Sequence, residues 1–121
     1  MDKLRILYVD DDADLRALVK DQLTPLGYGV DEAEDGTVAI EMLGKGNYDL
    51  MLLDINMPGK SGIDVLKFIK DRGLKSKVIM LTGRMGFSVA TETLKLGADD
   101  YITKPFTIDY LQFSITRVMG K

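Results

Sequence analysis

Residues 49–54 read DLMLLD, a short apolar run that ends on a carboxylate. A run of this length and composition is typical of a strand that is buried on both faces of a parallel sheet. A buried charge without a partner is costly, so Asp54 at the end of this run needs a cation or a chemical role. A carboxylate in such a place can act as a nucleophile and accept a phosphoryl group as an acyl phosphate.

Four similar runs flank this one, and stretches of helical length separate them. We expect five strands, at Leu4–Val9, Gly29–Ala33, Asp49–Leu53, Lys77–Leu81 and Asp99–Ile102. Apolar residues in the intervening stretches recur with the i, i+3, i+4 spacing of amphipathic helices, and glycines punctuate their ends. The alternation predicts an α/β fold with a five-stranded parallel sheet and five helices that cover both faces.

Polar residues follow four of these strands, directly or after one intervening residue. They are Asp10, Asp11 and Asp12 after the first strand, then Asp54, Thr82 and Lys104. In open parallel sheets ligands bind at the carboxyl ends of the strands, so we expect these side chains to lie together at one edge. Carboxylates, a hydroxyl and an ammonium are the groups needed to bind a divalent cation and hold a phosphoryl group.

The acidic triplet favours a bound cation. Two like charges about 4 Å apart repel by ~4 kcal/mol at an effective dielectric near 20, and a metal ion relieves that repulsion. Ligands that are all oxygen favour a hard ion such as Mg²⁺. We assign this role to Asp10 and Asp11, and we expect Asp12 to be the N-cap of the first helix.

Composition excludes several classes of protein. The chain has 121 residues, which we interpret as one domain over residues 1–121, and it lacks both cysteine and histidine. Disulfides, thiolate sites and imidazole-based catalysis are therefore excluded. The net charge of −3 argues against a direct nucleic-acid partner. We see no signal peptide and no span long enough to cross a membrane, so we expect a cytoplasmic protein.

Four stretches resemble, in order and spacing, the motifs of response-regulator receiver domains of two-component signalling: ILYVDDD, LLDINMPGKSG, VIMLTG and GADDYITKPF. Together they cover essentially the whole chain. The resemblance implies a flavodoxin-like (βα)5 fold with the strand order 2-1-3-4-5. It also implies an Mg²⁺-dependent reaction, with Mn²⁺ as an alternative ion, in which Asp54 accepts a phosphoryl group.

The resemblance also assigns the residues around Asp54. Asp10 and Asp11 match the acidic pair that binds the metal, Asp11 more directly, and the backbone carbonyl of Asn56 matches a further metal ligand. Lys104 matches the lysine that pairs with the phosphoryl group, and its bond to Pro105 is expected to be cis.

Four residues also match positions that the family uses for switching or for tuning the phosphate lifetime. Thr82 corresponds to the switch hydroxyl that bonds to the phosphoryl group, and Tyr101 to an aromatic residue that turns inward with it. Tyr101 is equally compatible with ordinary packing. Asn56 and Arg84 occupy positions that tune the lifetime of the acyl phosphate.

The implied partners are a sensor histidine kinase or phosphotransfer protein, and a downstream output domain or protein. The output would bind a surface made by the fourth helix, the fifth strand and the fifth helix. The chain departs from the branch with winged-helix output domains, because Tyr110 and Ser114 stand where that branch usually has Glu and Arg. The usual salt-bridged dimer is therefore in doubt, and Tyr110 and Phe113 either bind another partner or belong to the core.

Three other functions deserve comparison. A flavin-binding domain of the same topology needs a first loop that cradles phosphate, whereas the acidic triplet would repel it. An aspartyl phosphatase usually has a second acid two residues after its nucleophile, where this chain has Asn56. A phosphorylation-independent pseudo-receiver, or an interaction module of the same fold, remains the alternative. We expect no external substrate, only catalysis of the domain's own phosphorylation and dephosphorylation.

Overall fold

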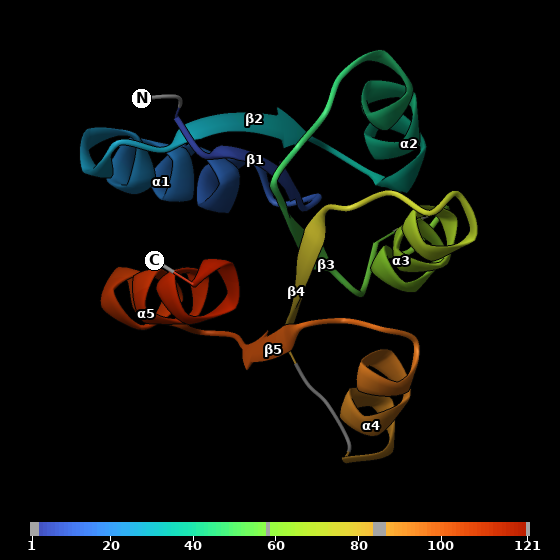
Figure 1. Ribbon diagram of the computed structural model, residues 1–121. Coiled ribbons are helices and arrows are strands. Elements are labelled where there is room, and N and C mark those ends of the chain that lie inside the picture. The colour runs from blue at the N-terminus through green and yellow to red at the C-terminus, as the bar shows by residue number, and fades with distance from the viewer. Residues whose placement is uncertain (1–2, 58, 84–86, 121) are drawn as a thin grey trace.

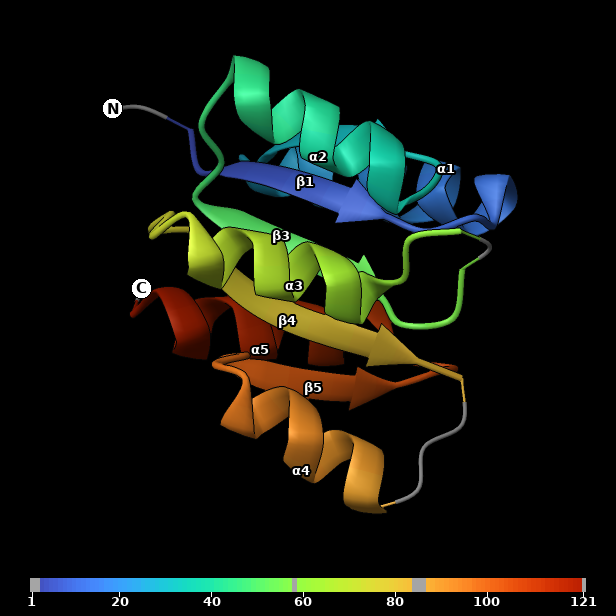
Figure 2. The same ribbon diagram turned by 90° about the vertical axis from the view of Figure 1, so that its right-hand side faces the viewer.

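A parallel sheet with the order β2-β1-β3-β4-β5 forms the centre of the molecule (Figure 1). The computed structural model describes residues 3–57, 59–83 and 87–120. Its strands are β1 (Arg5–Val9), β2 (Gly29–Ala33), β3 (Leu50–Asp54), β4 (Lys77–Thr82) and β5 (Asp100–Thr103). All four pairings are parallel, and the arrowheads in Figure 2 point to the same edge of the sheet. The predicted fold and strand order are confirmed.

Helices cover both faces of the sheet. They are α1 (Ala13–Leu23), α2 (Gly36–Lys45), α3 (Gly62–Asp71), α4 (Phe87–Lys95) and α5 (Ile108–Met119), with a short 3-10 turn, η1 (Thr24–Leu26). Figure 1 shows α1 and α5 on one side of the sheet and α2, α3 and α4 on the other. Within the described residues, none of these helices is both long and apolar enough to span a bilayer.

Two hydrophobic cores follow from this layering, because successive residues of a strand point to opposite faces. In β3, Met51 and Leu53 belong to the core under α2 and α3, while Leu50 and Leu52 belong to the core under α1 and α5. Every residue of β3 is buried. This double burial explains why the strand reads as a continuous apolar run rather than an alternating one.

Side-chain caps fix where the helices begin near the carboxyl edge of the sheet. Asp12 is the N-cap of α1, as predicted, and its Oδ1 accepts a hydrogen bond from the Leu15 N–H at 3.1 Å. A reciprocal capping box joins Ser61 and Asp64 at the start of α3. These caps hold the loop after β1, which carries Asp10 and Asp11, and the loop after β3, which begins directly after Asp54.

Three strands extend one residue further than predicted at their carboxyl ends. Asp54 pairs with Leu81, and Thr82 pairs with Thr103. Asp54 and Thr82 are therefore the last residues of β3 and β4 rather than the first residues of loops. Backbone pairing continues to these polar residues, which fixes their positions more firmly than a loop would.

Gly62 provides a close contact beneath Asp54. A Cβ placed on Gly62 would lie 2.3 Å from the backbone carbonyl oxygen of Asp54. Only a residue without a side chain allows the first turn of α3 to approach the end of β3 this closely. The glycine therefore positions the backbone of Asp54.

We expect Gly62→Ala to lower the free energy of unfolding by about 1–3 kcal/mol, because the added methyl overlaps the Asp54 carbonyl. Gly44→Ala is the matched control: it lies within α2 with no atom within 4 Å of its added Cβ. It should stabilise the protein by about 0.5–1 kcal/mol. Urea unfolding of both variants measures the difference. Equal effects of the two substitutions would show that the contact at Gly62 is not tight.

Candidate functional site

The predicted site residues meet at the carboxyl edge of the sheet. Asp10 follows β1 directly, Asp54 ends β3 and Thr82 ends β4, while Lys104 follows β5. Four strands thus bring together side chains that are up to 94 positions apart in the sequence. The Asp10 and Thr82 residues are fully buried, and Asp54 is 4% exposed. Such a concentration of buried polar groups at one sheet edge is unusual for a purely structural site.

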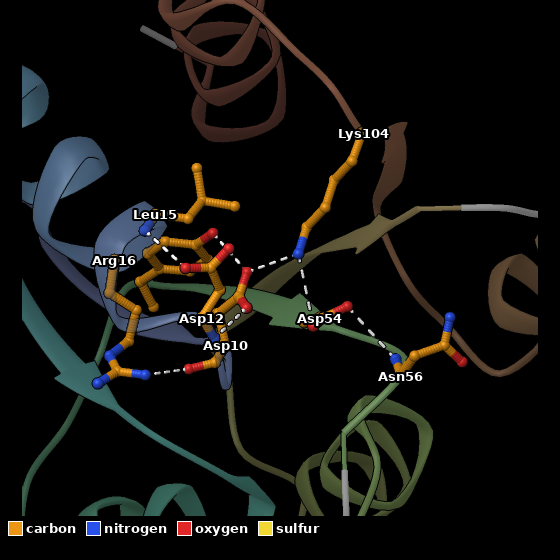
Figure 3. A network of polar contacts seen from close by, with 8 residues as sticks. Asp10, Asp12, Leu15, Arg16, Asp54, Asn56 and Lys104 are labelled. Atoms are coloured by element: carbon orange, nitrogen blue, oxygen red, sulfur yellow. Dashed lines mark hydrogen bonds and ion pairs between the residues drawn. The ribbon is translucent and has the colours of Figure 1, made fainter.

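Lys104 lies between the two buried carboxylates (Figure 3). Its Nζ is 2.7 Å from Asp10 Oδ2 and 3.4 Å from Asp54 Oδ2. The shorter contact is a charge-assisted hydrogen bond, and the longer one is an ion pair. The ammonium therefore neutralises part of the negative charge of the two carboxylates, and it lies closer to Asp10 than to Asp54.

Other groups fix the orientation of Asp10. Its Oδ1 accepts a hydrogen bond from the Asp12 N–H at 2.9 Å, and its Oδ2 accepts one from the Tyr8 hydroxyl at 2.7 Å. The guanidinium of Arg16 donates to the backbone carbonyl of Asp10. Figure 3 shows the Arg16 contact on the opposite side of Asp10 from Lys104. Asp10 is thus held through both its side chain and its backbone.

Asp54 has a second donor besides Lys104. The backbone N–H of Asn56 donates to Asp54 Oδ1 at 3.3 Å, while Lys104 lies on the Oδ2 side. Asn56 itself is exposed, so its side chain faces solvent next to the carboxylate. This arrangement holds both oxygens of Asp54 while the edge of the sheet stays accessible.

Asp10, Asp11 and Asp54 form a cluster that fits a hard divalent cation. One carboxylate oxygen from each lies within 4.8 Å of the others. Asp11 is exposed, whereas Asp10 and Asp54 are buried, so the cluster opens to solvent on one side. Oxygen donors with an open side suit Mg²⁺, which usually retains several water ligands in proteins. The chemistry of the donors therefore agrees with the cation predicted from the sequence.

Thr82 and Tyr101 lie in the neighbouring strands β4 and β5. Thr82 is fully buried at the end of β4, and its backbone carbonyl accepts a hydrogen bond from the Lys104 N–H at 2.6 Å. Tyr101, in β5, is half-buried and packs against the core under α2 and α3. The peptide bond between Lys104 and Pro105 is cis. Arg84 lies outside the described residues.

Charge and burial shift the acidities of the three central groups. Burial raises the pKa of Asp54 from 3.8 to about 6; Lys104 opposes this rise and the Asp10 charge adds to it. Burial also acts to raise the pKa of Asp10, but the hydrogen bonds from Lys104 and Tyr8 outweigh it and lower the pKa overall. The pKa of Lys104 is raised because its pairing with Asp10 outweighs its burial. At neutral pH an ammonium thus faces an ionised Asp10, and Asp54 titrates closest to neutrality.

A family comparison agrees with this geometry. The model of the response regulator receiver domain matches residues 6–116. The chain belongs to the response regulator receiver domain family. The matched residues run from β1 into α5 and include the acidic cluster and Lys104.

The curated relatives include proteins about as long as this chain and proteins about twice as long. The chain is 38% identical to the chemotaxis protein CheY of Pseudomonas aeruginosa and covers 98% of each protein. It is 43% identical over 108 residues to the transcriptional regulatory protein DltR of Streptococcus agalactiae. That alignment covers 89% of this chain and 48% of DltR. The receiver thus spans about half the length of DltR and nearly all of CheY.

Solved structures show the same fold. The receiver domain of the Francisella response regulator 1452 superposes with a TM-score of 0.91 at 31% identity and covers 98% of both chains. The response regulator protein TrrA of Thermotoga maritima, described as a complex with Mg(2+)-BeF, has a TM-score of 0.84 at 38% identity. That alignment covers 94% of this receiver and 97% of TrrA.

Sequence reasoning missed two residues that shape the site. Tyr8 belongs to the apolar run Leu4–Val9, but it lies two positions before Asp10 and therefore on the same face of an extended chain. The role of Gly62 depends on how closely α3 approaches β3, and spacing along the chain does not reveal that distance. The position of Tyr8 two residues before Asp10 is thus a signal in the sequence, whereas the sequence carries no such signal for Gly62.

We expect Asp54→Asn to stabilise the metal-free receiver at pH 7 by about 1–3 kcal/mol. Between pH 3.8 and about pH 6 the folded protein holds a proton on Asp54, whereas the unfolded chain releases it. The stability of the wild type therefore falls as the pH rises through this range. Asparagine has no such charge. Urea unfolding should show a small difference in the free energy of unfolding between the variant and the wild type at pH 4, and the full difference at pH 7. A difference that does not grow with pH would contradict the raised pKa.

Proposed function

We propose that residues 1–121 form a receiver domain in which Asp54 accepts a phosphoryl group from a histidine kinase or phosphotransfer protein. The observation that carries this proposal is the position of the Asp54 carboxylate. It is buried at the carboxyl edge of the sheet, with the Lys104 ammonium on one oxygen and the Asn56 N–H on the other. A carboxylate held at both oxygens has a fixed orientation, which favours its use as a nucleophile toward phosphorus.

The proposed transfer forms a bond between an oxygen of Asp54 and phosphorus, and it breaks the bond between phosphorus and the imidazole nitrogen of the donor. The electron pair of that bond leaves with the imidazole, which takes up a proton. Mg²⁺ or Mn²⁺, held by Asp10, Asp11, Asp54 and the backbone carbonyl of Asn56, would neutralise charge on the phosphoryl oxygens. Lys104 would move its ammonium toward those oxygens and stabilise them further.

Thr82 and Tyr101 are the proposed switch. Thr82 lies at the end of β4, one strand away from Asp54, so its hydroxyl is suited to bond to a phosphoryl oxygen. Tyr101 is half-buried, so its burial could increase or decrease when Thr82 moves. The two would convert added charge at Asp54 into a different surface over α4, β5 and α5. Asn56 and Arg84 would tune the lifetime of the acyl phosphate.

The same surface carries the proposed contact with an output domain or partner protein. Tyr110 and Phe113 on α5 are 50% and 60% exposed, so they are not core residues. Ser114, by contrast, is buried and donates to Asp100 Oδ2, to which Arg117 also forms an ion pair. Asp100 is thus satisfied within the chain, which leaves an aromatic rather than a charged contact on this part of α5.

The proposal predicts phosphorylation on incubation with Mg²⁺ and acetyl phosphate. Mass spectrometry of the intact protein should show the increment of one phosphoryl group, which is lost slowly as the acyl phosphate hydrolyses. Asp54→Asn should abolish the increment because it removes the nucleophile. Asp21→Asn, an exposed acid on α1, is the control and should label like the wild type.

Three outcomes would contradict the proposal or a part of it. A wild-type protein that folds but takes up no phosphoryl group would favour the pseudo-receiver. Undiminished labelling of Asp54→Asn would place the acceptor elsewhere. Omission of Mg²⁺ should also prevent labelling, and labelling without a divalent cation would remove the role of the acidic cluster.

A further inference from the structure

Tyr8 places a polar atom inside an otherwise apolar core. Its side chain is fully buried in β1 and packs in the core under α1 and α5. Its hydroxyl donates a hydrogen bond to Asp10 Oδ2 at 2.7 Å. The tyrosine is therefore a hydrogen-bond donor to this carboxylate. A phenylalanine would fill the same space without reaching the carboxylate.

The two oxygens of Asp10 are used unequally. Oδ2 accepts hydrogen bonds from both Tyr8 and Lys104, whereas Oδ1 accepts one from the Asp12 N–H. Each carboxylate oxygen has two lone pairs, so both acceptor positions of Oδ2 are occupied and one of Oδ1 remains. With Lys104 in place, the free acceptor position of Asp10 therefore lies on Oδ1, and the bond from Tyr8 occupies one position of Oδ2.

Lys104 is the partner that must move. It is shared between Asp10 and Asp54, and it lies beside the cluster of three carboxylates. A cation in that cluster repels the ammonium, and a phosphoryl group on Asp54 attracts it. In either case Oδ2 of Asp10 loses one of its two donors. Asp10 is fully buried, so an oxygen left without any donor would be costly.

We infer that Tyr8 is a positioning residue that keeps a donor on Asp10 Oδ2 when Lys104 leaves it. The tyrosine lowers the free energy needed to release Lys104 and holds the orientation of Asp10 while the site is occupied. This role rests on the proposed function, because it concerns the same cation and the same movement of Lys104. It predicts that Tyr8 affects ligand binding through Lys104 rather than through packing.

The test is a double-mutant cycle on Mg²⁺ binding, measured by calorimetry with the metal alone. Tyr8→Phe should weaken Mg²⁺ binding by about 5- to 30-fold, because the variant leaves Oδ2 without a donor once Lys104 departs. In a Lys104→Met background the same substitution should change binding less than about 2-fold, because Oδ2 then has the same donors before and after binding.

Tyr48→Phe is the matched control. Tyr48 is also nearly buried, and its hydroxyl donates to Asp31 Oδ2 at 2.7 Å, but it is not part of the acidic cluster. Its loss should leave Mg²⁺ binding unchanged. An effect of Tyr48→Phe as large as that of Tyr8→Phe would mean that general loss of stability explains both, and it would overturn the inference.

The outcomes separate this inference from the proposed function. A wild type that does not bind Mg²⁺ contradicts the cation site itself. A wild type that binds, with Tyr8→Phe binding equally well, overturns only the role of Tyr8. An equal loss in the presence and absence of Lys104 also overturns it, because the effect would then not depend on the release of Lys104.

A second measurement covers the case in which Tyr8→Phe does not fold. Wild-type protein labelled with 3-fluorotyrosine reports on Tyr8 by ¹⁹F NMR, with the signal assigned by replacing the other four tyrosines in turn. Mg²⁺ should shift the Tyr8 signal strongly in the wild type and much less in Lys104→Met. Equal shifts in the two proteins would overturn the inference.

Discussion

The ammonium of Lys104 is the interaction on which the functional edge of the molecule depends. Two buried carboxylates, Asp10 and Asp54, lie close enough to share it, at 2.7 Å and 3.4 Å. Without a positive charge between them, their mutual repulsion in a buried site would be severe. The position of Lys104 therefore depends on what else occupies the site. A cation can neutralise the carboxylates in its place, and a phosphoryl group on Asp54 can attract its ammonium away from Asp10.

The topology of the sheet brings these charged groups together. Parallel strands end at one edge, and each of four strands contributes one polar group there. Two close approaches then set the finer geometry: Gly62 lets α3 meet the backbone of Asp54, and Tyr8 reaches Asp10 from the core. The stability of the layers comes from the apolar strands, whereas the functional groups are placed at the ends of those strands, where they cost the core little.

Much of this was predictable from the sequence, and the reason is periodicity. Apolar runs and helical spacing predicted the parallel sheet, and the residues directly after the runs predicted the acidic cluster and Lys104. Sequence spacing could not predict distances between elements, which is why the contact of Gly62 was missed. It also left open whether Tyr110 and Phe113 are core or surface, because residues three positions apart share a helix face whether that face is buried or exposed. The structure shows both of them exposed.

The central claim is that the phosphoryl group resides on Asp54. Borohydride reduction of the phosphorylated protein tests it most directly, because it converts an acyl phosphate of aspartate to homoserine, and peptide mass mapping then locates that residue. The account predicts homoserine at position 54, and only after incubation with Mg²⁺ and the phosphodonor. Homoserine at Asp10 or Asp11, or a stable phosphate on a hydroxyl residue, would contradict it.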